Sequence, residues 1–137
     1  MAALPEDSEA CRWLRFALDD LRSATAVAKD DHSNPNVVCV LSQQAAEKAL
    51  KAVLVARSVR VPRTHDLLEL RALAGVGIAE DIIGEDLVRL SDWAIKARYP
   101  GGWREADAQD ASHSRAIAAT ICDGAEGYLG EAERSDS

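Results

Sequence analysis

The stretch that decides the fold is residues 34–57, NPNVVCVLSQQAAEKALKAVLVAR. The Asn34 side chain can cap a first turn, and Pro35 suits that turn because its missing N–H would have no partner there. At 100° per residue the apolar positions cover most of the helix circumference. They are Val38, Leu41, Ala45, Ala49, Leu50, Ala52, Val53, Leu54 and Ala56. A helix with so many apolar sides needs several neighbours, so we expect it to be the central helix.

Four further segments show helical periodicity, and almost none alternates with the period of two that is typical of strands. The expected helices are 8–29, 65–74, 80–97 and 107–129. Ser8 and Thr64 are the expected caps of the first and second of these. Long helices joined by short connections predict an all-α, up-and-down antiparallel four-helix bundle with an additional short helix. We expect one domain over residues 1–137, with a core of about 8–130 and a disordered tail, 131–137.

The first expected helix has one apolar face on which a carboxylate is the exception. Asp20 falls on that face, whose apolar members are Trp13, Phe16, Ala17, Leu21, Ala24, Val27 and Ala28. Small residues on several segments would let the helices approach closely.

Composition narrows the class of protein. The chain has 137 residues and a formal net charge of -7, which argues against a broad, nonspecific grip on nucleic acid, although a local basic stripe stays open. Hydrophobic residues are 47% of the chain but aromatic residues only 4%, so the core must be aliphatic. No apolar run reaches the roughly 20 residues that span a bilayer, and no signal-peptide core is visible. Cys11, Cys39 and Cys122 lie far apart and are expected to be reduced core residues of a cytoplasmic protein.

The segment Ala97-Arg98-Tyr99-Pro100 is the most informative candidate site. Arg98 is expected at the edge of the buried face of its helix, and a partly buried guanidinium needs an anionic partner because it cannot lose its charge. That partner could be Asp20, Glu47 or a bound phosphate. The helix dipole alone also favours a cation at this position.

Three other features stay open between a structural and a functional interpretation. Gln44, Glu47, Lys48 and Lys51 form one patch, which is either a solvated face or a charged binding surface. His65 stands beside Asp66 and could act as a general base, although capping explains Thr64 and Asp66 without it. Trp93 and Trp103 flank Arg98 and could stack on a base or cover the end of the bundle. No histidines share ligand spacing with a carboxylate, so we predict no metal and no cofactor.

Three segments in order resemble the HEPN domain, a small helical family named for higher eukaryotes and prokaryotes. They are LSQQAAEKALKA at 41–52, PRTHDLLEL at 62–70 and ARYP at 97–100, within a match of roughly residues 8–130. The resemblance implies a bundle of four or five helices, usually a homodimer, that works on nucleotides and RNA. Many bacterial members are encoded beside a minimal nucleotidyltransferase and behave as toxin–antitoxin pairs.

Catalytic members of that family are metal-independent ribonucleases, which use an Arg followed after four to six residues by a His, with two such sites meeting across the dimer. Here Trp103, Arg104 and Glu105 stand where that His belongs. Arg60 precedes His65 at a similar spacing, but this pair lies in the loop before the third helix, which is the wrong place for the motif. No residue at the expected position is therefore an obvious general acid or base for RNA cleavage.

Our leading hypothesis is a noncatalytic module that binds a nucleotide or a partner protein. Its expected partners are a second copy, a minimal nucleotidyltransferase and a nucleotide or RNA ligand, with no membrane. The alternatives are a divergent metal-independent ribonuclease toxin that uses Arg98, and a purely structural dimeric subunit. The candidate binding residues are Arg98, Tyr99, Gln44, Lys48, Lys51 and His65.

Overall fold

The structure is a computed structural model that describes residues 8–75, 77–97 and 99–134. Its five helices are α1 (Glu9–Ala28), α2 (Pro35–Ala56), α3 (Leu67–Ala74), α4 (Gly84–Lys96) and α5 (Ala108–Arg134). The described residues contain no strand, so the all-α prediction is confirmed. None of these helices is both long enough and apolar enough to cross a membrane.

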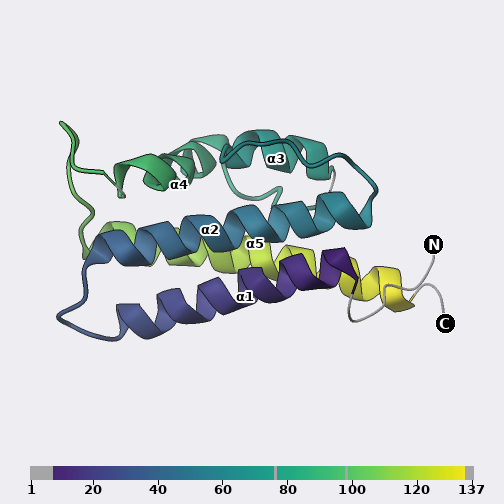
Figure 1. The fold of residues 1–137 in the computed structure, drawn as a ribbon, viewed down its shortest axis with the longest axis horizontal. Helices are drawn as coiled ribbons and strands as arrows, with labels where there is room; N and C mark the ends of the chain where they lie inside the picture. Colours follow the sequence, from purple (N-terminus) through teal and green to yellow (C-terminus); the bar gives the residue numbers. More distant parts are fainter. Residues whose placement is uncertain (1–7, 76, 98, 135–137) are drawn as a thin grey trace.

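The helices form three layers around α2 (Figure 1). α1 lies on one side, α2 and α5 lie in the middle, and α3 and α4 lie on the other side. α2 contacts each of the other four helices, which confirms its prediction as the central helix. Ser8 and Asn34 cap α1 and α2 through their side chains, as the sequence predicted.

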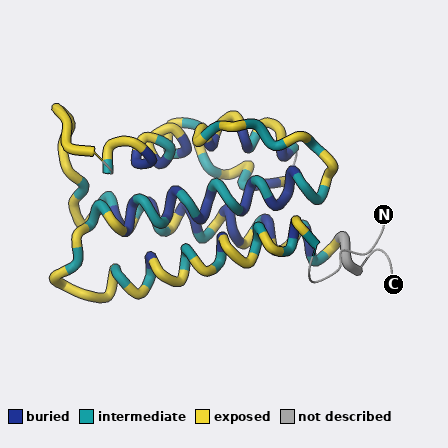
Figure 2. Tube along the Cα trace, viewed as in Figure 1, coloured by how far each residue is buried: buried dark blue, intermediate teal, exposed yellow. Residues whose placement is uncertain are grey.

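The core is aliphatic, and α1 packs on it through alanine. Ala10, Ala17 and Ala24 are buried on the same side of α1, seven residues apart, and they let this helix approach its neighbours closely. The prediction that Phe16 belongs to the apolar core face is wrong, because its ring is 52% exposed. The larger side chains of α1 that pack against the core are Leu14, Leu18, Leu21 and Val27, and Phe16 is not among them. Figure 2 shows how exposed and buried positions alternate along the helix.

Two helix starts differ from the prediction. α3 begins at Leu67, and its cap is Asp66, whose carboxylate accepts hydrogen bonds from the N–H groups of Leu68 and Glu69. α4 begins at Gly84 rather than near residue 80. The preceding turn is held by the Arg71 guanidinium, which donates to the carbonyl oxygens of Ala79 and Ile82. These carbonyls are therefore satisfied without a helix.

The C-terminal boundary also differs. α5 continues to Arg134, so residues 131–134, which we assigned to a disordered tail, are helical. The helix was expected to end at residue 129, but it continues through Gly130, since one interior glycine costs only about 1 kcal/mol. Cys39 and Cys122 are buried, as predicted, and burial raises the pKa of their thiols to about 11 and about 12. Cys11 is half-buried.

Candidate ligand-binding site

The structure divides the predicted site residues into two separate groups. Arg98 lies outside the described residues. Tyr99 is 62% exposed in the segment after α4, where Asn36 at the start of α2 lines the same hollow. Lys48 and Lys51 lie 12 and 15 residues further along α2 than Asn36, which corresponds to about 18 and 22 Å along the helix axis. The candidate residues therefore do not converge on a single site.

Lys51 and His65 meet around Glu47. One carboxylate oxygen of Glu47, Oε1, contacts His65 Nδ1 at 2.6 Å, and the other, Oε2, accepts a hydrogen bond from Lys51 Nζ at 2.9 Å. The amide of Gln43, which is fully buried, also donates to Glu47 Oε1 at 2.9 Å. This cluster ties the middle of α2 to the loop before α3. Gln44, which we had predicted as a binding residue, is half-buried. The glutamine that contacts Glu47 is Gln43.

Glu47 is ionised because of these contacts. Burial alone would raise its pKa, but the hydrogen bonds from Gln43, His65 and Lys51 outweigh burial, and the pKa is lowered. The side chains of Glu47 and Lys51 are each only 12% exposed. This part of the predicted stripe is thus neither a solvated face nor an open cationic patch.

Lys48 is also paired with a carboxylate. Its Nζ donates to Asp20 on α1 at 2.6 Å, which explains why a carboxylate stands on the apolar side of that helix. Asp20 and Glu47 were the candidate protein partners of Arg98. Within the described residues, Asp20 contacts the basic side chain of Lys48, and Glu47 contacts those of Lys51 and His65.

A different surface opens at the end of α4. Trp103 lies across this end, where its Nε1–H donates to the carbonyl oxygen of Lys96 at 2.6 Å. Its indole packs over Gly101, since a Cβ atom there would come within 2.6 Å of the ring. Lys96 and Trp103 line two neighbouring hollows of about 320 and 340 Å³. Tyr99 and Pro100 line the second hollow, so the ARYP segment borders this surface.

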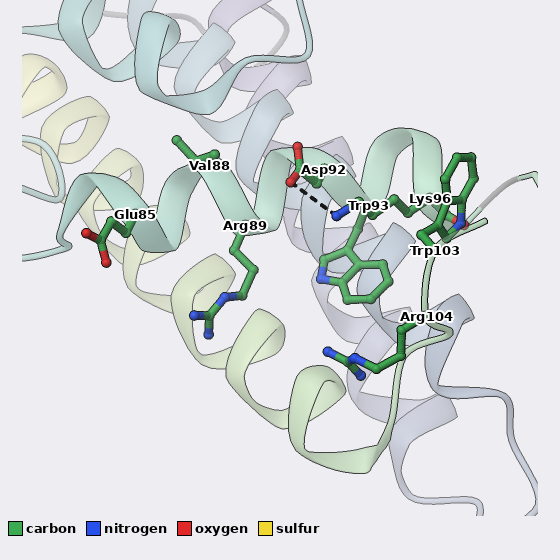
Figure 3. A pocket seen from close by; sticks show the side chains of 8 residues that line it. All are labelled: Glu85, Val88, Arg89, Asp92, Trp93, Lys96, Trp103 and Arg104. Carbon is green, nitrogen blue, oxygen red and sulfur yellow. Dashed lines mark hydrogen bonds and ion pairs between the residues drawn. The ribbon is translucent and has the colours of Figure 1, made fainter. Parts of the chain in front are cut away.

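The first hollow combines indole rings with cations (Figure 3). Trp93 is 5% exposed and extends from α4 beside Arg89, while Arg104 points toward the same indole from the segment before α5. Lys96 forms an ion pair with Asp92 at 3.5 Å. Arg89 is exposed and makes no hydrogen bond or ion pair within the described residues. Of the three cations that line this hollow, Arg89, Lys96 and Arg104, Arg89 is therefore the one most available to an anionic ligand.

Arg104 is held in place by the start of α5. Its Nη1 donates to Asp110 Oδ2 at 2.6 Å, and its Nη2 donates to Asp110 Oδ1 at 3.3 Å. The hydrogen bond from Arg104 is the main reason that the pKa of Asp110 is lowered to about 2. The N–H of Ala106 donates to Asn36 Oδ1 at 2.8 Å, which fixes the same segment to α2. One wall of the hollow is thus rigidly attached to two helices.

Sequence reasoning found Trp93 and Trp103 but missed Arg89 and Arg104. Arg89 has a signal that could have been used, since it lies one helical turn before Trp93 on α4. Arg104 has no local signal, because its place depends on the path of the segment between Pro100 and Ala106. Trp93 is buried at 5% exposure, whereas Trp103 remains 36% exposed.

The histidines do not form a metal site. Among the described residues, no group of three His, Cys, Asp or Glu side chains is placed to hold a metal ion. His65 contacts Glu47, and His113 on α5 contacts Asp86 on α4 at 3.1 Å. The second contact links two helices near the first hollow but does not line it.

Comparisons with known proteins agree with this fold. A crystal structure from Thermus thermophilus superposes with a TM-score of 0.69 at 28% identity, covering 86% of this chain and 96% of that one. An archaeal HEPN homologue gives the same TM-score at 24% identity, covering 94% and 99%. No curated protein matches the sequence. The sequence profile of the HEPN domain matches residues 10–128, and the chain therefore belongs to the HEPN domain family.

Proposed function

We propose that this chain is a noncatalytic HEPN module that binds a nucleotide at the end of α4, through Arg98, Tyr99 and the surface around Trp103. The observation that carries the proposal is the pair of hollows on either side of Trp103 and Lys96. Their volumes lie at the low end of the range for small-molecule sites, which is about 300–1,000 Å³.

The chemistry of the surface suits a nucleotide. Trp103 offers an exposed indole face on which a base can stack, and base–aromatic stacking contributes about 1–3 kcal/mol per base. Arg89 offers a guanidinium without a carboxylate partner in the described part of the chain, and guanidinium groups bind phosphate in a bidentate manner. An aromatic face and an unpaired cation within one hollow are the two groups that a nucleoside phosphate requires.

The proposed biological role is a partnership with a minimal nucleotidyltransferase in a toxin–antitoxin type of system. This role follows from membership of the HEPN family and from the absence of His among Trp103, Arg104 and Glu105. Without an imidazole at those positions, the module would bind a ligand or a partner rather than cleave RNA.

Titration with ATP and with GTP tests the proposal directly. We expect saturable binding by the wild-type chain and at least tenfold weaker binding by Arg98→Ala and Arg89→Ala. Arg60→Ala is the matched control, because Arg60 is an exposed arginine in the loop before α3, away from this surface. No saturable binding at millimolar nucleotide, or equal losses in all three variants, would end the nucleotide proposal.

Incubation of the purified chain with RNA tests whether the chain lacks ribonuclease activity. Intact RNA, and equal growth of cells expressing wild-type chain or Arg98→Ala, are the expected results. RNA cleavage that disappears in Arg98→Ala would replace the proposal with the ribonuclease alternative. Copurification with a minimal nucleotidyltransferase encoded beside the chain tests the partner, and its failure would remove that role without affecting the nucleotide site.

A further inference from the structure

Arg104 lines the first hollow, and the fold holds its guanidinium group along one edge only. Of its five N–H donors, two on Nη1 bond to Asp110 Oδ2 and to the carbonyl oxygen of Glu105, and one on Nη2 bonds to Asp110 Oδ1. The Nε–H and the second N–H of Nη2 lie parallel along the other edge, and neither has an acceptor in the described part of the chain. The side chain is 65% exposed. This second edge is therefore free to bind two oxygen atoms of one ligand.

The pairing with Asp110 sets the direction of that free edge. Asp110 is only 14% exposed, and its carboxylate also accepts a hydrogen bond from the N–H of Asp107 at 3.0 Å. In return, the N–H of Asp110 donates to Asp107 Oδ1 at 2.8 Å. These contacts fix the carboxylate at the start of α5, so the plane of the guanidinium group is set before a ligand arrives. A side chain that is already ordered loses less conformational entropy on binding.

Arg89 approaches the same hollow from α4 and offers a different property. In Figure 3 the indole of Trp93 lies between the side chains of Arg89 and Arg104. Arg89 is exposed and has no ion pair within the described residues, so it supplies charge without a fixed direction. Arg104 supplies a fixed direction, although Asp110 neutralises much of its charge. A phosphate group between them would use the charge of one arginine and the geometry of the other.

The charges around the hollow suit one phosphate group and oppose a chain of them. Glu85 and Asp92 also line the hollow, and Asp92 pairs with Lys96 at 3.5 Å. Among the described lining residues, Arg89 is thus the one cation without a carboxylate partner. A second and a third phosphate would lie near carboxylates and find no further unpaired cation there. The net charge of -7 on the chain adds to this repulsion.

We propose that Arg104, positioned by Asp110, binds the phosphate of a nucleoside monophosphate together with Arg89. This inference rests on the proposed function, and it adds the class of nucleotide and the residue that orients the phosphate. Asp110 touches no ligand in this arrangement, so it is a positioning residue. A lysine at position 104 could supply the charge but not the two parallel N–H groups.

Titration with adenosine, AMP and ATP, and with their three guanine counterparts, tests the class of ligand. Nuclear magnetic resonance can follow it, since this method measures weak binding. In the series that binds more tightly, we expect the monophosphate to bind at least tenfold more tightly than the nucleoside, and the triphosphate no more tightly than the monophosphate. A smaller gain from the first phosphate, or tighter binding of the triphosphate, would overturn this inference but not the nucleotide site. No binding of any of these ligands would overturn the proposed function as well.

Conservative variants separate direction from charge. Arg104→Lys should weaken binding of the monophosphate at least tenfold and leave binding of the nucleoside unchanged, because only the phosphate uses the lost edge. Arg89→Lys is the matched control, and it should weaken binding of the monophosphate less than threefold because the free charge remains. Equal effects of the two variants would overturn the assignment of Arg104.

Asp110→Asn is the sharpest variant, because charge and position predict opposite effects. Removing a carboxylate beside the hollow would by charge alone strengthen the binding of an anion. Loss of positioning should instead weaken binding of the monophosphate at least threefold and spare the nucleoside.

The matched control for that variant is Asp107→Asn. It removes a carboxylate that lies 3.7 Å from Arg104 Nη1, and asparagine keeps the cap at the start of α5. We expect no weakening of binding in this control, and unchanged melting temperatures would confirm that every variant folds. Unchanged or tighter binding of the monophosphate by Asp110→Asn, or an equal loss for monophosphate and nucleoside, would overturn the inference. Arg104→Lys tests it independently of the α5 cap.

Discussion

The middle of α2 and the end of α4 both gather cations and aromatic rings, but they differ in what neutralises the charge. Lys48 and Lys51 bind carboxylates at 2.6 and 2.9 Å, and the Nζ atom of each also lies over an aromatic ring. Arg89 has no such partner within the described residues. A paired cation in a half-buried setting stabilises the fold, whereas an unpaired one at a hollow is available to a ligand. The comparison separates charges that a carboxylate of the fold neutralises from a charge that has no such partner, which the sequence pattern alone could not do.

Removing the carboxylate of Glu47 should have the largest effect on stability. Glu47→Ala leaves Lys51 without its carboxylate in a site that is only 12% exposed, and it leaves the Gln43 amide with only its long, 3.5 Å hydrogen bond to the carbonyl oxygen of His65. We expect a loss of about 3 kcal/mol in the free energy of unfolding, measured by urea denaturation. Glu126→Ala, at an exposed position on α5, should change it by less than about 0.5 kcal/mol. A loss below about 1 kcal/mol for Glu47→Ala would mean that the cluster is not structural.

The end of α3 offers a paired test of conformational strain. Gly75 and Gly77 have φ angles of 90° and 96°, which disfavour any other residue. A Cβ atom at Gly75 would also collide with the Arg57 guanidinium, which donates to the carbonyl oxygen of Ala74. We expect Gly75→Ala to cost about 2 kcal/mol and Gly77→Ala, which meets no atom, about 1 kcal/mol. Equal losses in the two melting curves would show that the Arg57 contact contributes nothing.

The pH dependence of stability should reflect Glu47. Because its folded pKa is lowered, its contribution is fully present above the unfolded value of 4.5 and is lost as the pH falls through the folded pKa. The difference in unfolding free energy between wild type and Glu47→Gln should therefore shrink as the pH is lowered below about 4.5. A difference that stays constant from neutral pH to pH 3 would contradict the assignment of an ionised Glu47.

The smallest effect on stability is expected at the end of α4. Trp103→Ala removes a ring that is 36% exposed, so the free energy of unfolding should change by less than about 1 kcal/mol. Nucleotide affinity should nevertheless fall about tenfold, because the stacking face is lost. Gly101→Ala would push the indole from its place and should reduce affinity in the same direction. Unchanged affinity in both variants would remove Trp103 from the site.

Much of the fold could be predicted because its signals are local. Ser8 and Asn34 cap helices through side chains two or three residues from the N–H groups that they bind, so their effect can be read from neighbouring residues. The central place of α2 follows from the number of its apolar sides. The start of α4 could not be predicted, since Arg71, eight and eleven residues earlier, satisfies the carbonyls of Ala79 and Ile82.

The candidate site was harder to predict because its ion pairs join residues that lie far apart in the sequence. The periodicity of α2 groups Lys48 and Lys51, but the carboxylate that binds Lys48 comes from α1, 28 residues earlier. Periodicity also cannot show how wide a buried face is, which is why Phe16 was placed in the core. The position of Arg104 depends on a segment that carries little periodic signal, and it became evident only in the structure.

The different surroundings of the three tryptophans give the chain a set of built-in optical probes. The sequence contains three tryptophans, one on α1 (Trp13), one in the covered interior below α4 (Trp93) and one at the exposed α4 end (Trp103). Replacing two of them at a time with phenylalanine leaves a single emitter in each variant. The emission of Trp103 would then follow ligand capture, and that of Trp93 would follow global unfolding. Two events that a bulk fluorescence signal would mix could be recorded separately.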